Sequence, residues 1–175
     1  MKIILLTAVF ATISLLLISC RQHRPLPVVD KVDLDKYAGK WYSIASLPTS
    51  FEKGCACTSA EYGLSEKGHV TVKNSCFREG KNSVTSGKAF VKKNSNNAKL
   101  SVQFFWPFKG DYWIIALGDQ YQYAMVGHPN RKYLWILNRE RTMPEETLKG
   151  LLEKAASLGF DTDKVRRINQ SNCTQ

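Results

Sequence analysis

The chain has 175 residues, a formal net charge of +10 and 43% hydrophobic residues. About 155 residues follow position 20, with no second hydrophobic span and no repeat, so we expect one soluble domain and exclude a large multidomain protein. The basic excess fits nucleic acid, an anionic membrane surface or a solvated face. Because the basic residues are scattered and the chain carries an export signal, we expect no nucleic-acid partner.

The first twenty residues are typical of an export signal. Lys2 gives a positive start, positions 3–17 carry no charge, and the small Ser19 precedes Cys20. The apolar run is shorter than the ~20 residues that span a bilayer. We expect residues 1–19 to be a removed signal peptide; a plain signal cut elsewhere and a short membrane anchor are the alternatives.

The end of this signal resembles the lipobox of bacterial lipoproteins. Leu17-Ile18-Ser19-Cys20 carries the resemblance, which implies that Cys20 becomes the lipidated first residue of the mature protein. Such lipoproteins carry three acyl chains, and stable anchoring needs more than one. Arg21 replaces the aspartate that retains enteric lipoproteins at the inner membrane. The resemblance therefore implies the outer membrane, with the domain facing the periplasm.

The cysteine count agrees with lipidation. The chain has five cysteines, an odd number that leaves one thiol without an internal partner. Removing Cys20 leaves Cys55, Cys57, Cys76 and Cys173 for two disulfides, which form readily after export. Cys55 and Cys57 are separated by one residue, and the sequence has no second Cys or His pair that could complete a metal site with them. We therefore expect no metal and no cofactor.

Residues 20–32 contain Pro25 and Pro27 without periodicity, and we expect a tether there. Short β-branched and aromatic runs then alternate with turn residues, which predicts strands. The predicted strands are 41–46, 57–64, 70–76, 86–91, 100–105, 112–117, 121–127 and 133–138. The predicted turns are 66–68, 79–82, 94–97 and 128–130. Eight strands with short links predict an antiparallel up-and-down meander.

One helix is predicted after the last strand. Residues 142–145 resemble a capping box with a proline in the first turn, and Gly159 is the expected end. The apolar stripe consists of Leu148, Leu151, Leu152, Ala155 and Ala156. This order predicts a mainly β protein: a closed eight-stranded antiparallel barrel with one C-terminal helix packed outside it. An open sandwich is the alternative.

Three motifs in order resemble the lipocalin family. Residues 33–42 include Gly39 and Trp41 of its opening signature, Asp119-Gln120-Tyr121 resembles the second motif, and Arg139 resembles the third. The family's second motif usually reads threonine-aspartate-tyrosine, so Gln120 is a departure that can alter the local turn. The resemblance implies a lipocalin domain over residues 33–175, with Trp41 closing the barrel floor and Arg139 stacking across it.

Further segments resemble the branch of the family that contains bacterial outer-membrane lipoprotein lipocalins and apolipoprotein D. These are residues 51–54, 112–114, 133–137 and 159–161. The Cys57 segment resembles one whose cysteine bridges to the end of the chain, which implies Cys57–Cys173 and leaves Cys55–Cys76. The strand register does not exclude the alternative pairing, Cys55 with Cys173 and Cys57 with Cys76, because side chains two residues apart share a face.

The resemblance implies a protein that binds or carries a fatty acid or lysophospholipid, in storage or maintenance of envelope lipid. The candidate ligand contacts are aromatic residues on predicted strands: Tyr62, Phe90, Phe104, Tyr112, Trp113, Tyr123 and Tyr133. About half of them can point inward. Phe105, Trp106, Pro107 and Phe108 are expected at the mouth or facing the membrane.

Two alternatives remain at this point. A secreted soluble carrier is one, and residues 169–171 and 172–174 match the glycosylation acceptor pattern. A lipocalin enzyme that uses a cavity thiol or histidine is the other. His23, His69 and His128 have no recognisable catalytic partner, so we expect no enzymatic activity and no catalytic residue.

Overall fold

The computed structural model describes residues 25–171 and Cys173; the predicted signal peptide and Cys20 lie outside these residues. The strands are β1 (Gly39–Ser46), β2 (Ala56–Leu64), β3 (Val70–Arg78), β4 (Lys81–Val91), β5 (Lys99–Gln103), β6 (Gly110–Leu117), β7 (Tyr123–Gly127), β8 (Leu134–Asn138) and β9 (Arg166–Arg167). The helical elements are α2 (Leu34–Tyr37), α3 (Glu145–Ser157) and the 3-10 turn η1 (Thr162–Lys164).

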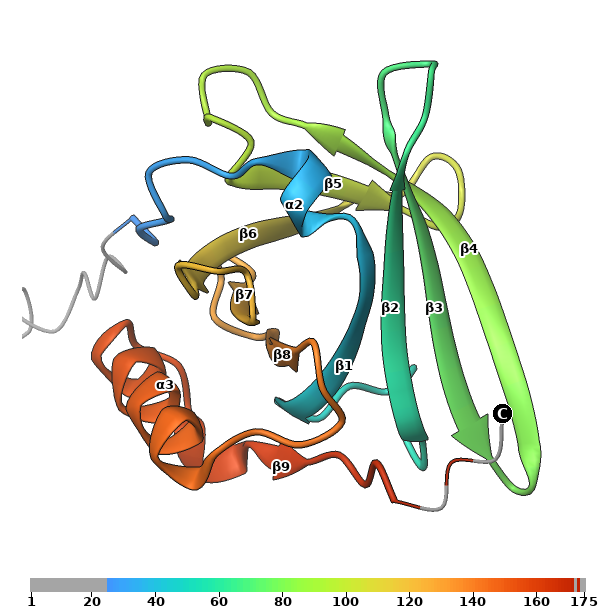
Figure 1. The fold of residues 1–175 in the computed structure, drawn as a ribbon, viewed down its shortest axis with the longest axis vertical. Helices are drawn as coiled ribbons and strands as arrows, with labels where there is room; N and C mark the ends of the chain where they lie inside the picture. Colours follow the sequence, from blue (N-terminus) through green and yellow to red (C-terminus); the bar gives the residue numbers. More distant parts are fainter. Residues whose placement is uncertain (1–24, 172, 174–175) are drawn as a thin grey trace, which may run out of the picture.

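The first eight strands form a closed antiparallel barrel. Neighbours in the sheet follow chain order from β2 to β8, β8 pairs with β1, and β1 pairs back with β2 (Figure 1). The predicted barrel is therefore confirmed and the open sandwich is wrong. Closure leaves no exposed edge among these strands. The short β9 is an addition that sequence patterning missed, and it pairs with Ala45 and Ser46 of β1.

Two apolar cores lie on the two sides of the barrel wall. One is inside the closed end and includes Trp41, Val72 and Ile114. The other lies between the wall and α3, where Leu148, Leu151 and Ala155 are buried. Figure 1 shows α3 outside the barrel, as predicted. Alternating side chains on each strand supply both cores, one from each face.

The start of α3 differs from the prediction, and its end agrees with it. The N-cap is Pro144 without a side-chain hydrogen bond, so the capping box over residues 142–145 is wrong. At the other end Gly159 has φ +88°. Its N–H donates to Ala156 O, and the Phe160 N–H donates to Ala155 O, which is a Schellman motif.

The boundary of β4 also differs from the prediction. Only Glu79 and Gly80 form the turn after β3, both with positive φ, so the hairpin has a two-residue loop and β4 begins at Lys81 rather than Ser86. The polar residues at the start of β4 are exposed, and they therefore lack the apolar alternation on which the prediction depended.

The described part of the predicted tether packs onto the barrel. Leu26 is buried in the core beneath α3, and Val32 is buried at the closed end. Val29 N–H donates to Ile114 O at 3.0 Å, and Val32 N–H donates to Asn96 O at 2.9 Å. Residues 25–32 thus belong to the packed domain. Among the described residues, no helix has the length and apolarity needed to cross a membrane.

Candidate functional site: the barrel cavity

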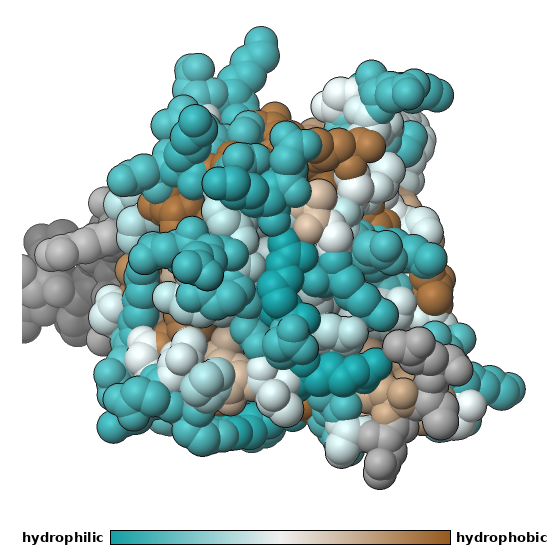
Figure 2. Space-filling view, in the orientation of Figure 1, coloured by the Kyte–Doolittle hydropathy of each residue, from teal (hydrophilic) through white to brown (hydrophobic). Residues whose placement is uncertain are grey.

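The barrel encloses a cavity of about 520 Å³ above the closed-end core. Apolar and aromatic side chains make up much of its lining, among them Ala60, Val72, Val102, Trp135 and Leu137. Figure 2 shows that the outer surface in this view is mostly hydrophilic, with hydrophobic residues in separate patches. A volume of this size and such a lining are typical of sites for small hydrophobic ligands.

The floor beneath the cavity is held by Arg139 and Trp41. The guanidinium carbon lies 3.8 Å from the centroid of the fully buried Trp41 ring. Arg139 donates from Nε to Tyr121 O, from Nη1 to Lys40 O and from Nη2 to Lys36 O. Because Gly39 beside Arg139 has φ +91°, a backbone conformation that other residues rarely adopt, this position favours glycine.

The second motif is joined to the same floor. Tyr121 has φ +58°, its N–H donates to Gly118 O, and its hydroxyl accepts the Asp33 N–H at 2.9 Å. Gln120 extends this turn, and its N–H donates to Gln122 Oε1. The departure from the usual motif therefore gives a turn that still connects Tyr121 to the segment before α2.

Three tyrosine hydroxyls meet where the cavity reaches the floor. Tyr112 Oη lies 2.8 Å from Tyr37 Oη and 2.8 Å from Tyr62 Oη. Burial raises the pKa of Tyr62 to about 12 and raises the pKa of Tyr37 and of Tyr112 well above 10. All three hydroxyls are therefore neutral at physiological pH, and the deep end of the cavity carries no charge.

A half-buried carboxylate lies higher in the cavity. Glu52, in the loop after β1, accepts hydrogen bonds from Trp135 Nε1 at 3.1 and 3.2 Å and from Thr49 Oγ1 at 3.0 Å. Burial raises the pKa of Glu52 even though these donors favour its charged form. Tyr133 stacks on Trp135 with ring centroids 6.0 Å apart, and Phe51 stacks on Tyr133 at 6.3 Å.

The rim combines exposed aromatic rings with a cation. Phe105 and Phe108 line the cavity although they are 72% and 77% exposed. Trp106, between them, is 85% exposed and is not among the lining residues. Lys109 lines the cavity beside them, with Nζ 4.6 Å from the Phe90 ring centroid. The expectation that this cluster lies at the mouth agrees with the position of Phe105 and Phe108.

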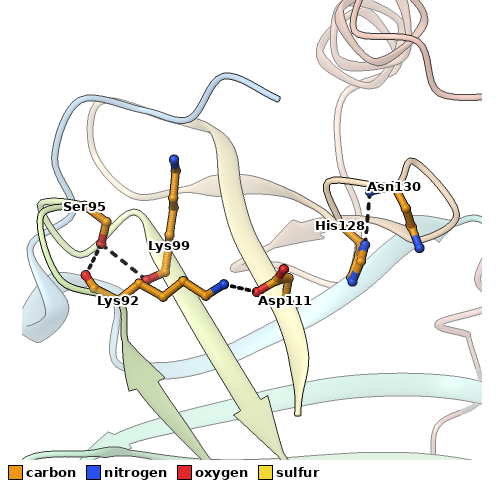
Figure 3. Close-up of polar contacts among 6 residues, drawn as sticks. All are labelled: Lys92, Ser95, Lys99, Asp111, His128 and Asn130. Carbon is orange, nitrogen blue, oxygen red and sulfur yellow. Dashed lines mark hydrogen bonds and ion pairs between the residues drawn. The ribbon is translucent and has the colours of Figure 1, made fainter. Parts of the chain in front are cut away.

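Two further titratable residues of the lining have partners on the protein (Figure 3). Asp111 forms an ion pair with Lys92, whose backbone carbonyl accepts the Ser95 hydroxyl. His128 Nδ1 accepts the Asn130 N–H at 3.1 Å within the turn between β7 and β8. One ring nitrogen of His128 is thus used to hold a turn.

Four of the seven candidate ligand contacts line the cavity: Tyr62, Phe104, Tyr112 and Tyr133. The other three lie outside its lining. Trp113, adjacent to Tyr112 on β6, lies under Lys99 with Nζ 4.3 Å from its ring centroid. Tyr123 packs against the core beneath α3, and Phe90 contacts His69.

Several lining residues were missed by the sequence prediction. The missed residues include Phe51, Glu52, Trp135, Ser43, Thr58 and Asn74. The prediction selected only aromatic residues, so it left out the polar ones. It also considered only predicted strands, so it left out Phe51 and Glu52 in the loop after β1. Trp135 shares a face with Tyr133, and that period-2 spacing was a usable signal.

The structure contains the two disulfides Cys55–Cys76 and Cys57–Cys173, the pairing that the resemblance implied. Cys57 has φ +53° at a bulge in β2, which distinguishes it from Cys55. Its N–H donates to Asn169 O at 2.7 Å. The C-terminal segment thereby lies along the barrel beside β1 and β2.

Comparisons with known proteins agree with this architecture. The family described as "Lipocalin-like domain" matches residues 32–170. Temperature-induced lipocalin-1 of Arabidopsis thaliana is 38% identical over 160 residues, covering 86% of each chain. Outer membrane lipoprotein Blc of Escherichia coli (strain K12) is 36% identical over 165 residues, covering 91% of this chain and 93% of the relative.

Apolipoprotein D of Bos taurus is also similar, at 35% identity over 158 residues, covering 85% of this chain and 82% of the relative. Among solved structures, insecticyanin from the tobacco hornworm Manduca sexta superposes with a TM-score of 0.69 and 26% identity. That superposition covers 88% of this chain and 87% of insecticyanin.

Proposed function

The chain belongs to the lipocalin family, and from this premise we propose that its cavity binds and carries a fatty acid or lysophospholipid. The observation that carries the proposal is the 520 Å³ cavity, lined largely by apolar and aromatic side chains above an uncharged floor. An acyl chain matches such a lining because burying it removes apolar surface from water. We infer that the polar headgroup stays at the rim.

The rim supports this orientation of the ligand. Lys109 is a cation beside exposed aromatic rings, and an anionic carboxylate or phosphate at the mouth would be attracted to it. The opposite orientation would bring a charged headgroup to the three neutral tyrosines, where burial of an unpaired charge is costly.

A titration of delipidated protein with oleate and with lysophosphatidylcholine, followed by calorimetry, tests the proposal. Ala60→Trp fills the cavity from β2, and we expect it to weaken binding at least tenfold. Glu61→Trp is the matched control, because residue 61 is exposed beside Ala60 on the same strand. Equal affinity of both variants, or no binding by the parent protein, would overturn the proposal.

We further propose that Cys20 is acylated and anchors the protein to the outer membrane, on the periplasmic side. The lipobox-like sequence and the similarity to Outer membrane lipoprotein Blc support this location. The similarity to Apolipoprotein D favours the secreted alternative. Mass spectrometry of the mature amino terminus discriminates them: an acylated Cys20 supports anchoring, and an unmodified terminus cut elsewhere supports a soluble carrier.

We propose binding without catalysis. The enzyme alternative needed a reactive thiol or a free histidine in the cavity. Its four candidate thiols are in disulfides, and His128 holds a turn through Nδ1. Recovery of oleate and lysophosphatidylcholine unchanged after long incubation is the expected result, and a new product would contradict it.

A further inference from the structure

One wall of the cavity carries three buried polar atoms without a hydrogen-bond partner in the described part of the protein. They are Ser43 Oγ, Thr58 Oγ1 and Asn74 Oδ1. All three residues line the cavity, and Ser43 and Thr58 are 3% and 9% exposed. Buried polar groups in native proteins are nearly always paired. We name these three residues the polar patch.

The polar patch is built by three adjacent strands. Tyr42 of β1 pairs with Ser59 of β2, and the next residues, Ser43 and Thr58, are held together because Gln170 Nε2 donates to both of their carbonyls. Asn74 of β3 pairs with Ala60, two residues along β2 from Thr58. Side chains at such neighbouring positions are within reach of one another. A single functional group in the cavity can therefore contact more than one of them.

The backbone around the polar patch is held by the C-terminal segment. The pairing of β1 with β2 ends at Tyr42 and Ser59, and Gln170 Nε2 then donates to Ser43 O and to Thr58 O, both at 2.8 Å. The Cys57–Cys173 disulfide fixes this segment beside β2. Gln170 thus satisfies the two carbonyls while the two hydroxyls are left for the cavity.

The polar patch lies between the floor and the rim. Along β3, Val72 pairs with Tyr62 of the floor, and Asn74 is the next residue on the same face towards the turn at Glu79 and Gly80. A hydrocarbon chain that reaches the floor from the rim therefore passes the polar patch. An unsubstituted chain would separate these polar atoms from water without offering them a hydrogen bond, which is unfavourable.

From this placement we propose that the preferred ligand is a lipid with a neutral hydroxyl group on its acyl chain, away from the headgroup. The inference rests on the proposed function, since it assumes that the cavity holds an acyl chain. A hydroxyl both donates and accepts, so it can donate to Asn74 Oδ1 and accept from Ser43 or Thr58. A carboxylate only accepts, and Lys109 is the only lysine or arginine among the described lining residues.

Competition between stearic acid and its 9-, 10- and 12-hydroxy derivatives tests the proposal on the full mature protein. We expect at least one hydroxystearate to bind five-fold or more tighter than stearate. In Ser43→Ala/Thr58→Val this preference is expected to fall below two-fold while stearate binds as well as before or better. The single variant Thr58→Val preserves the shape of the side chain, and we expect it to reduce the preference in part. It keeps the test decisive if the double variant does not fold.

Ser86→Ala is the matched control, because Ser86 is exposed on β4, and it must keep the preference. Equal binding of stearate and all three hydroxystearates would overturn the inference and leave the proposed function intact. A preference that survives in the double variant would also overturn it. Failure of every fatty acid to bind would instead reject the proposed function.

Discussion

At the scale of single residues, Arg139 holds the closed end of the barrel together. Its three nitrogens donate to the carbonyl of Tyr121 just before β7, to that of Lys40 in β1 and to that of Lys36 in α2. The guanidinium also stacks on Trp41. A lysine has no planar fork and cannot make these contacts together. Neither Trp41 nor Arg139 lines the cavity, so the pair stabilises the fold.

Arg139→Lys is expected to lower the free energy of unfolding by roughly 1 to 3 kcal/mol, because hydrogen bonds and stacking are lost together. Ligand affinity should not change. Urea unfolding and a ligand titration check the two parts. Arg141→Lys is a matched control, since Arg141 also stacks on a ring, that of Tyr42, at 4.9 Å. Equal destabilisation by both substitutions would contradict this role of Arg139.

The three floor tyrosines predict a loss of stability in alkali. Their pKa values are raised in the folded state, to about 12 for Tyr62, whereas an unfolded chain releases these protons near about pH 10. Unfolding is therefore favoured as the pH rises from about 10 towards 12. In Tyr62→Phe the free energy of unfolding should fall less steeply over this range.

An absorbance titration of tyrosinate provides the check. Of the seven tyrosines, Tyr37, Tyr62 and Tyr112 are expected to ionise late, and Tyr62→Phe should remove one residue from this late phase. Ionisation of all seven in a single early step would contradict the buried network.

The sequence predicts that aromatic strand residues line the cavity, but it does not tell which of these residues do so. Sequence patterning identifies aromatic strands, yet the choice between Tyr112 and Trp113 depends on which face of β6 is inward. Bulges in β1, β2 and β6 shift that alternation locally. Polar lining residues such as Ser43 and Thr58 give no sequence signal, because only the register makes them neighbours.

At the scale of elements, the C-terminal segment completes the barrel wall. β9 pairs with β1, Ile168 N–H donates to Ile44 O, and Gln170 contacts the carbonyls of both β1 and β2. Cys57–Cys173 joins this segment covalently to β2 across a sequence separation of 116 residues. Cys55–Cys76 joins the residue before β2 to β3 across a sequence separation of only 21 residues.

The longer disulfide should therefore contribute more stability. Chain-entropy arguments give roughly 4 to 5 kcal/mol for Cys57–Cys173 and roughly 3 kcal/mol for Cys55–Cys76. Cys57→Ser/Cys173→Ser is expected to unfold at lower urea than Cys55→Ser/Cys76→Ser, by denaturation followed with circular dichroism. The reverse order would contradict the stabilising role of the C-terminal segment.

The strands were predictable because apolar alternation and turn residues agree over most of the chain. The errors share a physical cause: local sequence does not report tertiary contacts. α2 has four residues and depends on the Asp33 cap, whose carboxylate accepts the Asp35 and Lys36 N–H groups. β9 has two residues and exists through pairing with β1. Residues 25–32 carry no periodicity, and only their packing orders them.

At the scale of the whole molecule, the barrel separates a hydrophilic exterior from an apolar interior. Most lysines and arginines lie on the surface, and the cavity has one of them, Lys109, at its rim among the described lining residues. A ligand that binds only the folded barrel stabilises it by mass action.

Bound lipid is therefore expected to raise the melting temperature. At a free oleate concentration of about 100 times Kd, the gain is about 2.7 kcal/mol. Differential scanning calorimetry should show this shift for the parent protein and for Glu61→Trp, and little shift for Ala60→Trp. An equal shift in Ala60→Trp would mean that oleate acts outside the cavity.

The most direct test of the cavity as a lipid-binding site is native mass spectrometry of the protein purified from its native cells without delipidation. We predict that one lipid with an acyl chain is bound per chain of the parent protein and that it is lost in Ala60→Trp. A parent protein that is free of lipid, or an Ala60→Trp variant that retains the same lipid, would contradict the claim that the cavity is a lipid-binding site.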